Sequence, residues 1–152
     1  MSSPSIAVNR RAQYEYFISE KFEAGIVLTG TEVKSVREHK VNLQDAYVTL
    51  LRGEAFVVGM HIGVYSHAQN IAAIDPIRTR KLLLHKSEIG KLAGLISRKG
   101  LTCVPLSLYF KKGVAKVQIG VAKGKQQHDK RQALKKKMYD REIRQALKRK
   151  SR

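Results

Sequence analysis

The sequence lacks several kinds of residue and segment on which common classes of protein depend. Cys103 is its single cysteine, so no internal disulfide framework can form. Its longest uncharged apolar run, residues 55–65, is far shorter than the roughly 20 residues that cross a bilayer. The first nine residues have neither the charged start nor the long apolar core of a secretory signal. We therefore expect a cytoplasmic protein that is neither disulfide-stapled nor integral to a membrane.

Side chains for catalysis or metal binding are also scarce. Asp and Glu number only 12, and the five histidines include no pair at the i, i+4 spacing that lets a helix hold a metal. The sequence contains no Cys/His cluster and no phosphate-binding glycine loop. We therefore expect no enzymatic activity, no catalytic residues, no metal and no other cofactor. A nuclease built from the nine acidic residues of positions 1–119 is the weakest alternative.

Positive charge is what the sequence has in excess. It holds 30 Lys and Arg against 12 Asp and Glu, a formal net charge of +18, which predicts a polyanionic partner such as nucleic acid. Positions 1–119 carry 17 basic against 9 acidic residues, a net charge of +8, and positions 120–152 carry 13 against 3, a net charge of +10. Since the hydrophobic pattern weakens at the same place, we predict a folded domain over residues 1–123 and a basic tail over residues 124–152.

Short β-strands dominate the pattern before the tail. Aromatic and β-branched residues favour a strand over residues 14–23. Residues 46–51 and 55–62 flank a short loop with a glycine, and residues 101–110 and 114–121 flank another, so each pair predicts a hairpin. The pattern therefore predicts a mainly β fold, a closed antiparallel OB-like barrel with two or three small helices.

Helical signals before the tail are few. Thr31 is a candidate cap for a short helix over residues 32–38. Ser87 is a candidate cap for a second helix, in which Leu92 and Ile96 share one face and which Gly100 ends.

The tail combines strong helix formers with a narrow apolar stripe. The stripe consists of Leu134, Met138, Ile143, Ala146 and Leu147 at near-helical spacing. The basic runs at 135–137 and 148–150 would repel one another in an isolated helix. We therefore expect the tail to be disordered alone and helical when bound to RNA.

A compact basic segment follows Pro76. Its charged members are Arg78, Arg80 and Lys81, which could clamp phosphate groups. A solvated charged surface explains the same three residues equally well, so this segment leaves both interpretations open.

Three ordered motifs resemble those of the small protein B family. They are residues 23–37, 78–85 and 124–131, and the resemblance runs from Asn9 into the tail. Members of this family are the SsrA-binding proteins, partners of transfer-messenger RNA in bacterial ribosome rescue. The resemblance implies a monomeric OB-like barrel that binds the tRNA-like domain of transfer-messenger RNA. It also implies that the tail enters the decoding site and the empty mRNA channel of the ribosome as a helix.

The resemblance also implies which residues bind the tRNA-like domain. They are Asn9, Arg10, Glu23, Arg80, Lys81, Leu83, His85, Lys123, Gly124 and Lys125. Glu23 is an unusual RNA contact, but a carboxylate can accept hydrogen bonds from a base edge or a 2′-hydroxyl. The alternative is a structural acid that orders a neighbouring Arg or Lys. His85 stands where relatives often have Asn, and Gln126 where they often have Lys.

In the tail, the resemblance assigns residues to the decoding site and the mRNA channel. They are His128, Asp129, Lys130, Arg131, Lys135, Lys136, Lys137 and Tyr139. His128 matches the position expected to stack on a base, and stacking tolerates any base. A basic tail on a β-barrel would also suit a rival function, a ribosomal-protein-like factor that binds ribosomal RNA permanently. Presence on all ribosomes, rather than on stalled ones, would favour that rival.

Overall fold

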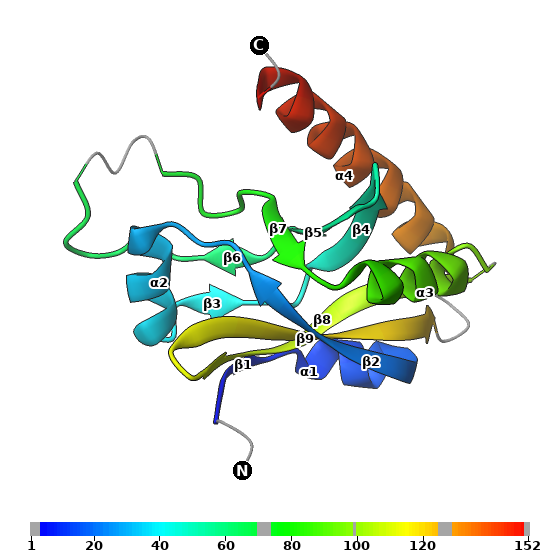
Figure 1. The fold of residues 1–152 in the computed structure, drawn as a ribbon, viewed down its shortest axis with the longest axis horizontal. Coiled ribbons are helices and arrows are strands. Elements are labelled where there is room, and N and C mark those ends of the chain that lie inside the picture. Colours follow the sequence, from blue (N-terminus) through cyan, green and yellow to red (C-terminus); the bar gives the residue numbers. More distant parts are fainter. Residues whose placement is uncertain (1–3, 70–73, 99, 125–128, 151–152) are drawn as a thin grey trace.

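The computed structural model describes residues 4–69, 74–98, 100–124 and 129–150, except the side chains of 129–135, 137, 149 and 150 (Figure 1). In chain order the elements are β1 (Ser5–Val8), α1 (Arg10–Glu15), β2 (Tyr16–Ile26), α2 (Gly30–Arg37), β3 (Val41–Asn42), β4 (Tyr47–Leu51), β5 (Glu54–Val58), β6 (His61–Ile62), β7 (Arg80–Leu83), α3 (Lys86–Ile96), β8 (Leu101–Lys111), β9 (Val114–Gly124) and α4 (Asp129–Lys150). Within this part of the chain no helix has the length and apolarity needed to cross a membrane.

One antiparallel sheet organises the molecule. Its seven strands follow the order β1-β8-β4-β5-β7-β2-β9, and β3 and β6 form a separate two-stranded sheet. Because β8 also pairs with β9, the pairings run from β8 through β4, β5, β7, β2 and β9 back to β8. The connection between β4 and β8 rests on a single register pair, Val48 with Cys103. The predicted mainly β fold is confirmed, and among the described residues three short helices, α1 to α3, lie before the tail and α4 lies in it.

Both predicted hairpins are present. The strands β4 and β5 turn at Arg52 and Gly53, with φ of 53° and 75°, and β8 and β9 turn at Lys112 and Gly113, with φ of 50° and 77°. Two residues with positive φ form the tight turn that matches the twist of paired strands. Alternate residues of β9 then point inward, where Ala115, Val117, Ile119 and Val121 belong to the hydrophobic core.

Strand β5 is shorter than its predicted 55–62 run. It ends at Val58, and Gly59 follows with φ of +78°. A Cβ at Gly59 would lie 2.9 Å from the backbone oxygen of Asp45, so both the close approach and the dihedral require glycine there. The chain turns at this point, and β6 pairs with β3 instead of continuing β5.

The predicted helix starts are wrong by two residues, and one helix was not predicted. Helix α2 begins at Gly30, because Thr29 forms a reciprocal capping box with Glu32 and leaves Thr31 inside the first turn. Helix α3 begins at Lys86 after His85, so Ser87 is not its cap. The short helix α1 occupies the start of the predicted 14–23 strand, so β2 begins at Tyr16.

Helix α4 packs against the body along one face (Figure 1). Ile143 is only 2% exposed, and Tyr139 and Leu147 pack against the same apolar cluster, which includes Tyr16, Tyr47, Val58, Val104 and Leu106. The rings of Tyr47 and Tyr139 have centroids 5.2 Å apart, and Thr49 Oγ1 donates to Asp140 Oδ1 at 3.2 Å.

The predicted apolar stripe of the tail only partly matches this contact face. Met138 is 66% exposed and Ala146 is also exposed, while Ile143 and Leu147 face the body. Leu134 lies among the side chains outside the description. The predicted helix is therefore present, whereas its disorder in isolation stays a prediction.

Candidate nucleic-acid interface

An open cleft on the outer face of the sheet unites three residues that the sequence indicated. Its lining consists of Glu23, Leu83, Leu84, His85, Glu88 and Lys116, around a cavity of about 550 Å³. Glu23 comes from β2, Leu83 ends β7, and His85 precedes α3. All three are exposed, so a large ligand can reach them.

Strand register explains why these side chains meet. Tyr109 of β8 lies opposite Lys116 of β9, and Lys116 lies opposite Gly25 of β2. Gly25 in turn lies opposite Leu83 of β7. Opposed residues point to the same face, so one row crosses four strands. A Cβ on Gly25 would lie 3.3 Å from Leu83 Cβ. Because glycine has no side chain, it leaves room for Leu83 at this position.

Glu23 is held by two donors at one side of the cleft. The hydroxyl of Tyr109 donates to its Oε2, and Lys111 Nζ lies 3.3 Å from its Oε1. The hydrogen bond from Tyr109 is the main cause that lowers the pKa of Glu23. Partial burial, followed by this bond, raises the pKa of Tyr109 to about 12. At neutral pH the pair is therefore an ionised carboxylate with a phenol donor.

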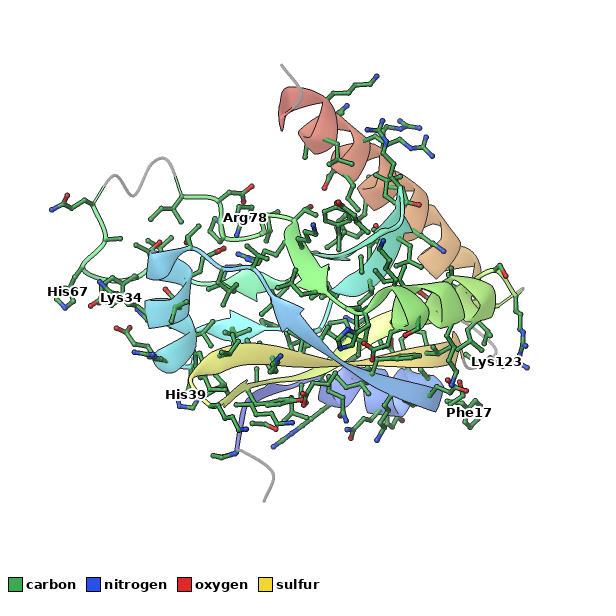
Figure 2. The ribbon with its side chains drawn as sticks, in the orientation of Figure 1. Phe17, Lys34, His39, His67, Arg78 and Lys123 are labelled. Carbon is green, nitrogen blue, oxygen red and sulfur yellow. The ribbon has the colours of Figure 1, made fainter. Side chains whose placement is uncertain are left out.

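Besides Lys116 in the cleft, a second cationic residue lies at the C-terminal end of β9. Lys123 is opposite Phe17 of β2, and both side chains are exposed (Figure 2). A cation beside an exposed ring can contact a phosphate and a base face together. Lys123 lies seven residues from Lys116 along the strand, a distance of about 23 Å, so the structure does not bring it into the cleft.

Other predicted contacts are not part of the cleft lining. Lys81 is on the outer face of β7, with its Nζ 3.4 Å from Glu54 Oε1. Arg10 begins α1 and is exposed. Gly124 ends β9 opposite Tyr16, where only its backbone can contact a ligand. Lys125 lies outside the described residues.

The side chain of Arg80, which was predicted to bind RNA, is buried inside the protein in this structure. Arg80 is 0% exposed, and its Nε lies 2.6 Å from Glu32 Oε2. Two more of its nitrogens donate to the backbone oxygens of Met60, at 2.7 Å, and Pro76, at 3.2 Å. Successive residues of a strand point to opposite faces, so Lys81 faces out and Arg80 faces in.

Asn9 is also structural here, not an exposed contact. It is 1% exposed, and its Nδ2 donates to the backbone oxygens of Leu43, at 3.1 Å, and Pro105, at 2.9 Å. Its Oδ1 accepts from the backbone N–H of Ala12, which caps α1. The Asn9 side-chain amide can make four hydrogen bonds, and three of them are thereby used inside the protein.

Comparison with known proteins identifies the family. The family model described as SmpB protein matches residues 6–149. The chain belongs to the SmpB family. An SsrA-binding protein of Clostridium botulinum (strain Eklund 17B / Type B) is 51% identical over 99% of this chain and 96% of its own length. One from a Nitratiruptor species is 54% identical over 94% of this chain and 96% of its own length.

A solved structure also resembles the chain. It is described as "tmRNA-SmpB: a journey to the center of the bacterial ribosome", and it is 44% identical in sequence. The match covers 84% of this chain and 93% of the other, with a TM-score of 0.66. The SmpB family assignment therefore rests on sequence and on fold together.

Two of the motifs that resemble the SmpB family meet in the interior. Glu32, from the first motif, accepts from Arg80 and from Arg78 Nη2, at 2.6 Å, both of the second motif (Figure 2 labels Arg78). Burial opposes ionisation of Glu32, but the bonds from Arg78, Thr29 and Arg80 outweigh it and lower the pKa. These motifs therefore include residues that hold α2 against β7, besides those at the cleft.

Sequence reasoning missed several residues at the cleft of this SmpB family member. Leu84, Glu88 and Lys116 line it, and Tyr109 and Lys111 hold Glu23 beside it. A signal was available, because the alternation in β9 turns Lys116 outward and the hairpin register places Tyr109 opposite it. What the sequence could not give is the position of β2 beside β9.

Of the predicted tail residues, two have described side chains. Lys136 accepts at its backbone oxygen from the hydroxyl of Tyr47, at 3.4 Å, and Tyr139 packs on the ring of Tyr47. His128 lies outside the described residues. Helix α4 includes the others, but their side chains lie outside the description: Asp129, Lys130, Arg131, Lys135 and Lys137.

Reactive groups are few in the part of the chain that the structure describes. No group of three or more His, Cys, Asp or Glu side chains in these ranges could hold a metal ion. Cys103 is buried, and burial raises the pKa of its thiol well above the ordinary value. A thiolate nucleophile at neutral pH is therefore disfavoured at this position.

Proposed function

We propose that the chain binds the tRNA-like domain of transfer-messenger RNA and brings this RNA to stalled ribosomes for trans-translation. The observation that carries the proposal is the exposed cleft that joins Glu23, Leu83 and His85 with Lys116 in a chain of net charge +18. The names of the relatives, SsrA-binding proteins, support RNA binding, and the tmRNA and ribosome in the description of the solved relative support the ribosomal role.

The cleft and the exposed lysines outside it supply the two components of RNA recognition. Lys116 and the exposed Lys81 and Lys123 attract phosphates, which gives affinity without reading sequence. The Glu23 carboxylate accepts from a base edge or a 2′-hydroxyl, and Leu83 offers an apolar contact, which together give specificity. None of these roles includes a catalytic step, and the protein acts in the cytoplasm, where ribosomes are.

The division of labour that we propose follows the predicted boundary. The circuit of strand pairs supports a closed OB-like barrel over residues 1–123, which holds the cleft. Residues 124–152 act as the ribosomal part, in the decoding site and the mRNA channel, with His128 stacking on a base and the lysines and Arg131 contacting phosphates. The helical form of α4 supports this assignment, because a preformed helix loses little further backbone entropy on binding RNA.

The first test is binding of the full chain to the tRNA-like domain and to an ordinary tRNA across a salt series. We expect tighter binding to the tRNA-like domain at physiological salt, with affinity for both RNAs falling as salt rises. Equal affinity for the two RNAs at every salt concentration would contradict the proposal and favour a general ribosomal-RNA-binding factor.

Replacing Glu23 with alanine should weaken specific binding without changing the salt slope, because the substitution removes no cation. We expect a loss of about 1–3 kcal/mol in binding the tRNA-like domain, the range for a well-formed specific contact. The control is Glu20→Ala on the same strand. Glu20 is exposed to 40% and pairs with Lys91, and Glu23 is exposed to 39% and pairs with Lys111. Equal effects of the two substitutions would make Glu23 an ordinary surface acid.

Deleting residues 124–152 should abolish rescue of stalled ribosomes but change affinity for the isolated tRNA-like domain by less than about tenfold. The expectation follows because the cleft lies wholly within residues 1–123. The deletion uncovers the apolar cluster around Tyr47, so the melting temperature of the fragment is measured alongside. A fragment that is folded but cannot bind the RNA would show that the tail belongs to the primary interface.

A further inference from the structure

We propose that Tyr109 is a positioning residue for RNA recognition, which fixes the Glu23 carboxylate at the cleft so that its free oxygen lone pairs face the RNA. The inference rests on the proposed function, in which Glu23 provides specificity. Tyr109 lies in none of the three sequence motifs, and its side chain is not among those that line the cleft.

The contact between the two side chains spans three strands. Tyr109 is on β8 and Glu23 is on β2, and β9 lies between them. Neighbouring strands are about 4.8 Å apart, so the two backbones are roughly 10 Å apart. Tyr109 reaches this distance because it points to the same face as Lys116 and Glu23, and its hydroxyl then donates to Glu23 Oε2. The bond therefore depends on the register of two strand pairings.

Two donors leave Glu23 with acceptor capacity for a ligand. An ionised carboxylate has about four lone-pair sites. Tyr109 occupies one site on Oε2 and Lys111 one on Oε1, both from the β8 side of the carboxylate. The side chain remains 39% exposed, and the cleft with Leu83 and His85 lies on its other side. The remaining lone pairs are therefore available to an RNA hydroxyl or amine.

Fixing the carboxylate matters because a glutamate on an exposed strand is otherwise flexible. Its side chain has three rotatable bonds, and ordering it on binding costs free energy. Lys111 alone is a weak tether, because its own long side chain is more than half exposed. The Tyr109 side chain is more rigid, with two rotatable bonds, so its hydrogen bond orders the Glu23 side chain before the RNA binds.

The test is a double-mutant cycle in the full chain. Wild type, Tyr109→Phe, Glu23→Ala and the double variant are titrated with the tRNA-like domain and with an ordinary tRNA. We expect Tyr109→Phe to weaken binding of the tRNA-like domain by about three- to tenfold, the range for one lost hydrogen bond. The salt slope should not change, and Tyr109→Phe should have no further effect once Glu23 is alanine.

Two outcomes would overturn the proposal. One is wild-type affinity in Tyr109→Phe, and the other is an equal loss in the Glu23→Ala background, which a general packing role would produce. The control is Tyr65→Phe, a tyrosine beside Lys34 and His67 and outside the cleft lining, for which no change is expected.

A measurement on the free protein separates failure of this proposal from failure of the proposed function. The Tyr109 bond is the main cause that lowers the pKa of Glu23, so Tyr109→Phe should raise that pKa toward the ordinary value. Carboxyl NMR through an acid titration reports it without RNA. An unchanged pKa would overturn the positioning role. The other outcome is a raised Glu23 pKa in Tyr109→Phe together with a wild-type protein that does not prefer the tRNA-like domain. It would support the contact between Tyr109 and Glu23 and overturn the proposed function.

Discussion

Replacing Arg80 with methionine is expected to lower the free energy of unfolding by about 3–5 kcal/mol, the range for breaking a buried ion pair. Arg80 is completely buried, and its guanidinium satisfies one oxygen of Glu32 and two backbone oxygens. Methionine fills similar volume but donates no hydrogen bond, so Glu32 remains buried and, among the described residues, keeps the ion pair with Arg78. Chemical denaturation of wild type and variant measures the difference.

The matched control is Lys81→Met, on the neighbouring residue of the same strand. It removes the same charge from the outer face, and we expect a change within about 0.5 kcal/mol. In RNA binding we expect the larger effect from Lys81→Met. This substitution should reduce the dependence of affinity on salt by about one phosphate contact. Equal stability losses in the two variants would contradict the structural role of Arg80.

The stability loss in Arg80→Met should also depend on pH. The pKa of Glu32 is lowered in the folded protein, so ionised Glu32 contributes stability at pH values above its unfolded pKa. This contribution is lost as the pH falls through the folded pKa. Without Arg80 the folded pKa rises, because burial then meets less compensation. The difference between wild type and variant should therefore shrink in acid, where a protonated Glu32 needs no cation.

Replacing Ile143 with aspartate is expected to release α4 from the body. Ile143 is almost completely buried between α4 and the cluster around Tyr47. Loss of its packing costs about 2–4 kcal/mol, and burying a carboxylate there would cost more, so the undocked helix becomes the favoured state. Hydrogen exchange in the full chain should then show faster exchange at residues 136–148, with the strands little changed.

Met138→Asp is the control for this prediction, because Met138 is an apolar residue of the same helix that faces solvent. We expect exchange in α4 to stay within about twofold of wild type, since surface substitutions change stability little. Similar release by both substitutions would show that the helix is held by its own propensity and not by the contact through Ile143.

Sequence patterns predicted the elements whose signals are local. The two hairpins follow from glycine-containing turns between alternating strands, and each turn involves only neighbouring residues. Helix starts were less certain, because Thr29 and Thr31 are both suitable caps and only the bond with Glu32 decides between them. Helix α1 has six residues and depends on Asn9, whose amide is fixed by distant backbone oxygens at Leu43 and Pro105. No local pattern contains that information.

The site shows the same limit. Resemblance pointed to positions and not to the reasons for them, so it grouped Arg80 with Lys81 although strand alternation turns them to opposite faces. It also indicated Glu23, Leu83 and His85 separately. Their common cleft depends on the pairing of β2 with β7 and on the glycine opposite Leu83. The contact of Tyr109 with Glu23 could not be predicted, because Glu23 lies two strands away in the sheet.

Helix α4 has one side that packs on the body and another that is exposed and carries basic residues, and this bears on the ribosomal role proposed above for the tail. Ile143 and Leu147 face the body, while Arg141 and Arg144 are exposed with the helix still docked. An RNA can therefore attract the docked helix before any apolar contact breaks, since electrostatic encounter needs only exposed cations. If the tail acts as proposed, the helix would pass through an intermediate that contacts both body and RNA. Its transfer rate should then depend on salt at the encounter and on apolar packing at the release.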